Sequence, residues 1–291
     1  MDWIHGGILF AGESARDCAN EGLAPPGDGY PAFESFSRFL HIARKNGPDN
    51  PVEVDLYADP ATLAGRVVPV LFGLDVGSTS TKAALVAEDG TVLAGLYTRT
   101  AGTPLEAAQS ICEAVQRIEA DCGVTFQTRL AATTGSGRKL AAAVLGADAA
   151  VDEITAHARA AVELDPEVDT IIEIGGQDSK FTVLSKGRVV FSQMNAVCAA
   201  GTGSFLEEQA ARLGVPLLEF ADRATGAPSP LTSDRCTVFM ERDLNHLQAL
   251  GYTTEELLAA SLFSVCDNYL VEDKGPSACL HATAKKIWEL A

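Results

Sequence analysis

Two segments of the chain share one pattern, in which a predicted strand ends in a carboxylate, turns at glycine and returns as a second strand. The first segment covers residues 75–82 (DVGSTSTK) and the second covers residues 173–180 (EIGGQDSK). Glycine permits the tight turn and lets the backbone approach a ligand closely. Two such hairpins facing each other across a cleft form a phosphate clamp, so the pair constrains the fold more than either segment does alone.

The first segment carries several groups that suit a phosphate. Gly77 allows the turn, and Ser78 and Thr79 offer backbone N–H groups and hydroxyls that can cradle phosphate oxygens. Lys82 follows on the returning strand, where its ammonium group can offset developing negative charge. The alternative interpretation is a plain β-hairpin with a polar turn. The segment is not a Walker A loop, because no Gly-Lys-Ser/Thr sequence follows at the required spacing.

The second segment repeats this arrangement with two adjacent glycines. Gly175 and Gly176 let the backbone come close to a bound group. Gln177 and Asp178 follow directly, and side chains of these types can orient an attacking water or hold Mg²⁺. We therefore take Gln177, Asp178 and Lys82 as candidate catalytic residues.

Strand–turn–strand units interleave with helices along most of the chain, which predicts an α/β fold rather than a simple Rossmann alternation. A buried strand begins at Val67. The main helices are expected over residues 105–120, 153–163, 204–213 and 254–269, with another beginning at Thr237. Thr202 and Gly203 lie where the third of these helices begins, so they are candidates for contact with a nucleotide.

Residues 1–68 differ from the rest because they are rich in Gly, Pro, Asp and Asn. One short helical pattern stands out over residues 33–44, with Phe36, Phe39 and Leu40 on one face. We interpret this segment as a linker or as the remnant of an upstream module, and not as a domain of its own.

The composition excludes some functions. A net charge of −17 and a pI of about 4.6 give a surface that repels phosphate backbones, so we expect no nucleic-acid partner. No apolar run approaches the ~20 residues that span a bilayer. Residues 4–12 are too short for a signal peptide and lack its basic flank. We therefore expect a cytoplasmic protein with no membrane partner.

The chain has seven cysteines, an odd number that argues against a disulfide framework in a reducing compartment. Most free cysteines behave as small apolar core residues, and we interpret Cys112 and Cys122 in this way. His157 is more readily explained as a structural histidine than as a ligand or base. The cysteines that match no recognisable site are Cys18, Cys266 and Cys279.

The paired turns resemble the two phosphate segments of the actin/hexokinase/Hsp70 superfamily. More specifically, the chain resembles the 2-hydroxyacyl-CoA dehydratase activators of the BadF/BadG/BcrA/BcrD ATPase family, which also includes benzoyl-CoA reductase subunits. The matching motifs are residues 75–82, 134–138, 153–158, 175–180, 194–203 and 236–239. The resemblance implies an actin-like (ribonuclease H-like) ATPase domain over residues 69–291, with a first lobe over 69–165 and a second over 166–291.

For function, the resemblance implies an ATPase coupled to electron transfer. In the family, a homodimer holds one [4Fe–4S] cluster between its subunits, and ATP turnover drives a low-potential electron into a dehydratase or reductase. Carried over by motif, Cys198 and Cys236 become the cluster ligands, because two thiolates from each subunit supply the four that such a cluster takes. Both cysteines precede predicted helices, whose N-terminal dipoles stabilise thiolate charge.

The resemblance also implies the cofactors and partners. ATP with Mg²⁺ would be bound, and a flavodoxin or ferredoxin type protein would donate the electron. The residues implied in nucleotide binding are Gly77, Ser78, Thr79, Lys82, Gly175, Gly176, Gln177, Thr202 and Gly203.

Three features depart from the family pattern. Glu173 stands where the superfamily commonly has Asp, and its extra methylene moves the carboxylate, so Asp178 or Asp75 would hold the Mg²⁺. The family's C-terminal adenosine-binding segment is not recognisable after Tyr269, and residues 1–68 have no counterpart in a single-module activator. We therefore expect a fragment of a longer tandem-module protein, incomplete at the C-terminus, and leave open its ATPase activity in isolation.

Two other functions are compatible with these residues. A small-molecule kinase of the same superfamily, acting on a sugar or an acid, would use the same turns, with Asp178 as the base toward a hydroxyl. A non-catalytic module that only contacts a partner would account for the missing C-terminal segment. Cys198 and Cys236 discriminate between the first two functions, because a kinase has no need of them.

Overall fold

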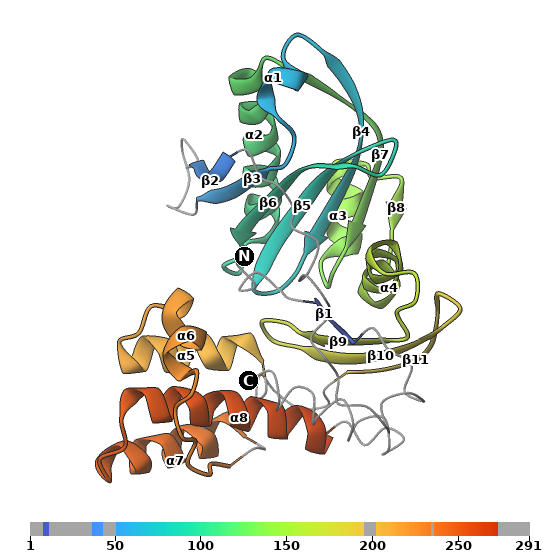
Figure 1. Ribbon diagram of the computed structural model, residues 1–291. Coiled ribbons are helices and arrows are strands. Elements are labelled where there is room, and N and C mark those ends of the chain that lie inside the picture. Colours follow the sequence, from blue (N-terminus) through green and yellow to red (C-terminus); the bar gives the residue numbers. More distant parts are fainter. Residues whose placement is uncertain (1–7, 12–36, 43–50, 195–201, 234–235, 273–291) are drawn as a thin grey trace. The chain divides into compact units, whose positions relative to one another are not determined.

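The computed structural model describes residues 8–11, 37–42, 51–194, 202–233 and 236–272. The chain divides into two compact units, one of residues 24–156 and the other of residues 1–23 together with residues 157–291. Each unit contains its own β-sheet (Figure 1). The division falls within helix α4 (Glu153–Leu164), so this helix carries the chain from one unit into the other.

The unit of residues 24–156 is built on a seven-stranded sheet with the order β2-β3-β6-β5-β4-β7-β8. Its strands are β2 (Ser37–Ile42), β3 (Val52–Leu56), β4 (Val67–Val76), β5 (Ser80–Ala87), β6 (Val92–Arg99), β7 (Thr125–Thr134) and β8 (Ala149–Ala150). β7 pairs parallel with β4 and with β8, and the other pairs are antiparallel. The long β4–β5 hairpin lies in the middle of this order, so the Asp75 turn sits on the central strands.

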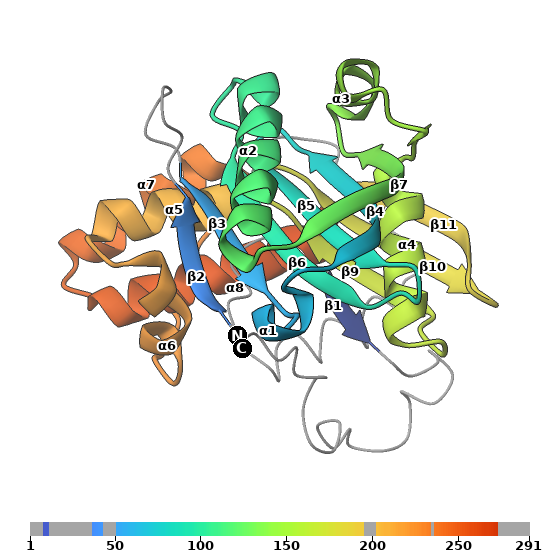
Figure 2. The same ribbon diagram turned by 90° about the horizontal axis from the view of Figure 1, so that it is seen from above.

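Helices cover the core of this sheet. They are α1 (Pro60–Leu63), α2 (Pro104–Cys122) and α3 (Arg138–Leu145). Figure 2 shows α2 lying along the sheet. Proline at the first position of α2 favours the start of the helix, and Gly123, in the left-handed conformation directly after Cys122, favours its end. Ile111 of α2 and Ala141 of α3 share one core with Leu74 of β4, so the helices bury their apolar faces on the strands that carry the turn.

The second unit contains a four-stranded antiparallel sheet with the order β1-β9-β10-β11. The strands are β1 (Ile8–Ala11), β9 (Thr170–Ile174), β10 (Ser179–Ser185) and β11 (Arg188–Met194). α4 packs its small Ala158 and Ala161 against Ile171 and Leu184 on one face of this sheet. Alternate residues point to opposite faces of a strand, and Ile172 accordingly packs with Phe181 and Tyr269 in a different cluster.

The rest of this unit is helical. It consists of α5 (Gly203–Leu213), the 3₁₀ helix η2 (Leu217–Glu219), α6 (Phe220–Ala224), α7 (Thr237–Ala249) and α8 (Thr254–Glu272). α5 ends at a left-handed Gly214, as predicted. Phe205 of α5, Met240 of α7 and Leu257 of α8 are fully buried in one core, which joins the three helices. Among the described residues, no helix combines the length and the apolar character needed to cross a bilayer.

The predicted α/β class is confirmed, but the helix expected over residues 33–44 is wrong. Its described part, residues 37–42, forms strand β2, which pairs with β3. Leu40 and Ile42 lie opposite Val54 and Val52, and this cross-strand pairing overrides the helical spacing of the apolar residues. β1, β2 and β3 all lie within residues 1–68, so this segment supplies strands to both sheets. Its origin as the remnant of an upstream module stays a prediction.

Candidate functional site

Asp75 and Lys82 lie opposite each other on β4 and β5, on either side of the first glycine turn. Lys82 Nζ is 3.8 Å from Asp75 Oδ2, and the two side chains are 33% and 28% exposed. The turn is closed by the Gly77 N–H, which donates to the Ser80 carbonyl at 3.0 Å. A Cβ at Gly77 would lie 2.9 Å from that same carbonyl oxygen, which explains the glycine. The turn therefore presents a carboxylate and an ammonium group side by side.

Two hydroxyls beside this turn have no bonding partner. Within the part of the chain that the structure describes, the Oγ1 atoms of Thr79 and Thr134 are buried and form no hydrogen bond. Thr134 ends β7 directly opposite Asp75. Since buried polar atoms are normally paired, these two hydroxyls are available to a ligand oxygen. The sequence analysis placed Thr134 in a matching motif but gave it no role, although its place at the end of a predicted strand was a usable signal.

The loop after β7 packs against Asp75. Gly135 has a φ of +83°, and a Cβ there would collide with Asp75 Oδ1 and with the Val76 carbonyl. The Gly137 N–H donates to the Val76 carbonyl at 2.8 Å, and Arg138 Nη1 donates to the Gly135 carbonyl at 3.0 Å. Residues 134–138 therefore form a wall of the Asp75 turn, a role that the sequence alone did not assign to them.

The second glycine turn joins β9 to β10 and is bonded to the beginning of α5. The Gly175 N–H donates to the Asp178 carbonyl at 2.7 Å, and the side chains of Gln177 and Asp178 are exposed. The first two N–H groups of a helix have no partner within the helix. Here the Gly203 N–H donates to the Gly175 carbonyl at 2.8 Å, and the Ser204 N–H donates to the Gly176 carbonyl at 2.9 Å.

Thr202 strengthens this junction. Its hydroxyl donates to the Gly176 carbonyl at 3.0 Å, and the residue is fully buried. A Cβ at Gly203 would lie 3.3 Å from the Gly175 carbonyl oxygen, closer than most real contacts, so glycine suits this position. The turn and the first residues of α5 thus form one hydrogen-bonded assembly.

Glu173, the residue that departs from the superfamily pattern, is buried and doubly paired. Its Oε1 lies 3.1 Å from Lys180 Nζ, and its Oε2 lies 2.6 Å from His157 Nδ1. Burial acts to raise the pKa of Glu173, but hydrogen bonds and positive charge from His157 and Lys180 outweigh it and lower the pKa below the ordinary value of 4.5. The carboxylate is therefore ionised near neutral pH, and the contact agrees with a structural role for His157.

Of the two proposed cluster ligands, the structure describes one. Cys236 is half-buried, forms no disulfide and has extended backbone angles (φ −147°, ψ 128°) directly before α7. Cys198 lies outside the described residues. Among the described residues, no group of three or more His, Cys, Asp or Glu side chains is arranged to hold a metal ion. Burial raises the pKa of the Cys112 and Cys122 thiols, as expected for unreactive cysteines.

The structure therefore brings the candidate residues together in two groups. Asp75, the first glycine turn and Lys82 belong to the unit of residues 24–156. The second glycine turn, Thr202, Gly203 and Cys236 belong to the other unit.

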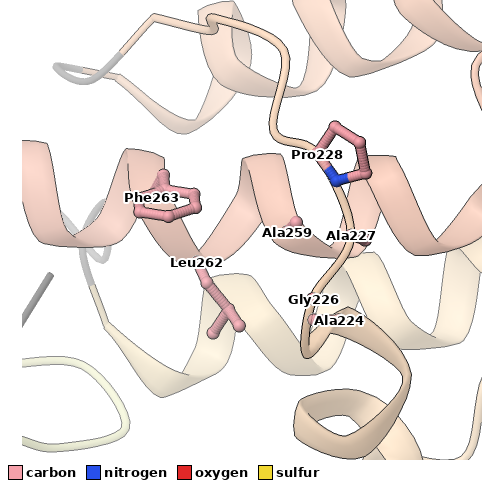
Figure 3. Close-up of a pocket in the computed structure, with 7 residues that line it drawn as sticks. All are labelled: Ala224, Gly226, Ala227, Pro228, Ala259, Leu262 and Phe263. Atoms are coloured by element: carbon pink, nitrogen blue, oxygen red, sulfur yellow. The ribbon is translucent and has the colours of Figure 1, made fainter. Parts of the chain in front are cut away.

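A cavity elsewhere in the second unit contains none of these residues. It measures about 260 Å³ and lies beside α6 and α8 (Figure 3). Its lining consists of Ala224, Gly226, Ala227, Pro228, Ala259, Leu262 and Phe263. No charged side chain is among them, so this lining cannot recognise a phosphate through charge.

Comparison with known proteins decides the family. Residues 72–270 match the BadF/BadG/BcrA/BcrD ATPase family, which is more than half of the chain. The chain belongs to this family. It is also 36% identical over 190 residues to the uncharacterized protein YjiL of Escherichia coli (strain K12), covering 64% of this chain and 70% of YjiL.

Two relatives of named activity were also found. The (R)-2-hydroxyglutaryl-CoA dehydratase activating ATPase of Acidaminococcus fermentans is 30% identical over 203 residues, covering 68% of this chain and 75% of the relative. The structure of the activator of the 2-hydroxyisocaproyl-CoA dehydratase from Clostridium difficile, with bound ADPNP, superposes with a TM-score of 0.63 at 27% identity. That match covers 75% of this chain and 85% of the activator, and it confirms the expected actin-like fold.

Proposed function

We propose that this chain is an ATP-dependent activator that passes a low-potential electron to a 2-hydroxyacyl-CoA dehydratase or a related reductase. The two glycine turns supply the nucleotide contacts. In the unit of residues 24–156, Ser78, Thr79 and Lys82 are the proposed contacts to phosphate oxygens, and in the other unit Gly175 and Gly176 are the proposed contacts. The unpaired buried hydroxyl of Thr79 supports this assignment, because it lacks the partner that a phosphate oxygen would give it.

Hydrolysis of the nucleotide falls to the exposed side chains of the second turn. Gln177 orients the water that attacks the γ-phosphate, and Asp178 or Asp75 holds Mg²⁺, so that ATP and water give ADP and phosphate. Lys82, 3.8 Å from Asp75, offsets the charge that develops on the phosphate oxygens. The related activator structure was determined with bound ADPNP, which supports nucleotide binding by a chain of this fold.

One observation carries the link from ATP to electron transfer, namely the bonding of the second turn to the beginning of α5. Gly175 and Gly176 accept three hydrogen bonds from residues 202–204. Cys198 lies just ahead of Thr202 in the sequence. A displacement of the turn by a phosphate would act on residues 202–204, and we propose that it passes from there to Cys198.

Cys236 lies next to a helix that packs in the same core as α5. It directly precedes α7, and Met240 of α7 shares a core with Phe205 of α5. The two helices that follow the proposed ligands are thus packed together, which suits cysteines that hold one shared group. A half-buried thiol directly before a helix is a suitable donor for an iron–sulfur cluster, because the positive end of the helix dipole favours the negative charge of a bound cluster.

When bound, a [4Fe–4S] cluster takes up and releases single electrons at low potential. With two thiolates from each chain, four would come from a homodimer. A flavodoxin or ferredoxin type protein supplies the electron, and the partner dehydratase or reductase accepts it. The names of the relatives, which are activators of dehydratases, support this partner class.

Iron analysis of protein purified without oxygen tests the proposal. We expect a brown protein with about four irons per dimer. Cys198→Ser and Cys236→Ser should each remove the colour. Cys112→Ser should keep it, because Cys112 lies on α2, in the unit of residues 24–156. A colourless anaerobic protein that phosphorylates a sugar or an acid in equal measure with ATP consumption would contradict the activator and favour the kinase.

A further inference from the structure

Glu173 links three elements of the second unit. It lies on β9 directly opposite Lys180 on β10, and its second oxygen is bonded to His157 on α4. Glu173 and Lys180 are 9% and 5% exposed, so both charges are buried. Since the carboxylate is ionised and can only accept, His157 Nδ1 carries the proton that it donates. Both oxygens of the carboxylate are therefore engaged by protein groups.

The same carboxylate lies beneath the second glycine turn. The turn begins at Gly175, and a Cβ at Gly175 would lie 3.9 Å from Glu173 Oε1. Glu173 is the residue before the last of β9, and only Ile174 separates it from Gly175. A shift of the turn on nucleotide binding therefore moves the end of β9 and with it the acceptor of His157.

His157 lies at the point where the chain passes between the units. It is the first residue of the second unit within α4, and residues 153–156 of the same helix belong to the other unit. Among the described residues, the buried apolar contacts of α4 in this cluster come from the small Ala158 and Ala161, and Val162 packs against them partly buried. Small side chains bury little area, so the hydrogen bond from His157 to Glu173 is an important polar contact between the first turns of this helix and the sheet.

We propose that Glu173, His157 and Lys180 form a positioning cluster that couples the second glycine turn to the connecting helix α4. In this role Glu173 acts through His157 and does not ligate Mg²⁺. The extra methylene of Glu173, relative to the Asp common in the superfamily, lets the carboxylate span Lys180 and His157. The inference rests on the proposed function, because it takes the nucleotide to bind at this turn.

Hydrogen exchange of the full chain, with and without MgADP, tests this coupling. In the wild type, MgADP should slow exchange both in residues 175–180 and in α4. In His157→Ala, the response of residues 175–180 should persist, while the response of α4 should fall by more than half. His157→Asn, whose amide nitrogen can replace Nδ1, should restore it. Arg159→Gln is the matched control, because it removes an exposed ion pair with Glu163 from the same helix.

The outcomes separate this proposal from the proposed function. A response of α4 that is equally large in His157→Ala and in the wild type would overturn the coupling while leaving the nucleotide site intact. A wild type in which residues 175–180 respond and α4 does not would overturn it as well. A wild type that gives no response to MgADP anywhere would contradict the nucleotide site itself, and the coupling with it.

Discussion

The Thr202 hydroxyl donates a hydrogen bond of 3.0 Å to the Gly176 carbonyl, and this bond ties the residue directly before α5 to the second glycine turn. The residue is fully buried, so water cannot replace the bond. Cys198, a proposed cluster ligand, closely precedes Thr202 in the sequence, so the bond joins the second glycine turn to a residue close in sequence to this cysteine.

Thr202→Val should weaken nucleotide binding and destabilise the fold by about 1 kcal/mol, because valine keeps the shape and loses the hydrogen bond. Urea unfolding and titration with MgADP would measure the two effects. Thr225→Val is the matched control, since it removes an exposed threonine hydroxyl bonded to the Ala221 carbonyl. If both variants bind MgADP as the wild type does, the hydroxyl of Thr202 does not support the turn.

Gly135→Ala should abolish nucleotide binding. It should also destabilise the protein by more than the cost of placing alanine in a left-handed backbone conformation. The new Cβ would collide with Asp75 Oδ1 and the Val76 carbonyl. Gly146→Ala is the control, because Gly146 is also left-handed, with a φ of +64°, but has open space around its Cβ position. The control should cost about 1 kcal/mol, which is the strain of the left-handed backbone. Equal losses in thermal stability for both variants would contradict the close packing at Asp75.

Glu173→Gln should destabilise the protein by about 3 kcal/mol near neutral pH, because it removes the carboxylate that pairs with the buried Lys180. The pKa of Glu173 is lowered in the fold, so its contribution is present above its ordinary value of 4.5 and is lost as the pH falls below it. The gap in unfolding free energy between wild type and variant should therefore narrow in acid. Glu255→Gln, at an exposed pair with Arg223, should show a much smaller gap. A gap for Glu173→Gln that does not change with pH would contradict an ionised Glu173 paired with Lys180.

Met240→Ala should lower the free energy of unfolding by about 3 kcal/mol, because it leaves a cavity in the core that joins α5, α7 and α8. It should also reduce the iron that the anaerobic protein retains, since α5 and α7 follow the two proposed ligands. Leu250→Ala is the control, as Leu250 is 63% exposed and follows α7. A destabilised variant with full iron content would show that the shared core does not position the cysteines.

Local signals made much of the fold predictable. α2 was expected from its apolar spacing, and the end of α5 was expected from Gly214, because both depend on residues adjacent in sequence. β2 was missed because its residues fit a helical face equally well, and only the pairing of Leu40 and Ile42 with β3 decides between the two. Such a partner is not visible in a local pattern.

The site divides in the same way. The glycine turns were predictable, because glycine, hydroxyl and carboxylate groups stand together in the sequence. The contact of Glu173 with His157 was not predictable, because His157 lies on another element. Only the packing of α4 on β9 brings His157 Nδ1 within 2.6 Å of Glu173 Oε2. The role of Gly135 was hidden for the same reason, because its need for glycine arises from Asp75 on a neighbouring strand.

The rate at which a chelator removes iron from the reduced, anaerobic protein tests the central claim most directly. If the second glycine turn controls the segment that holds Cys198, MgATP should change this rate several-fold in the wild type, and Thr202→Val should reduce the change. An iron-loaded protein that releases its iron at one rate, with or without MgATP, would contradict the coupling of nucleotide to cluster.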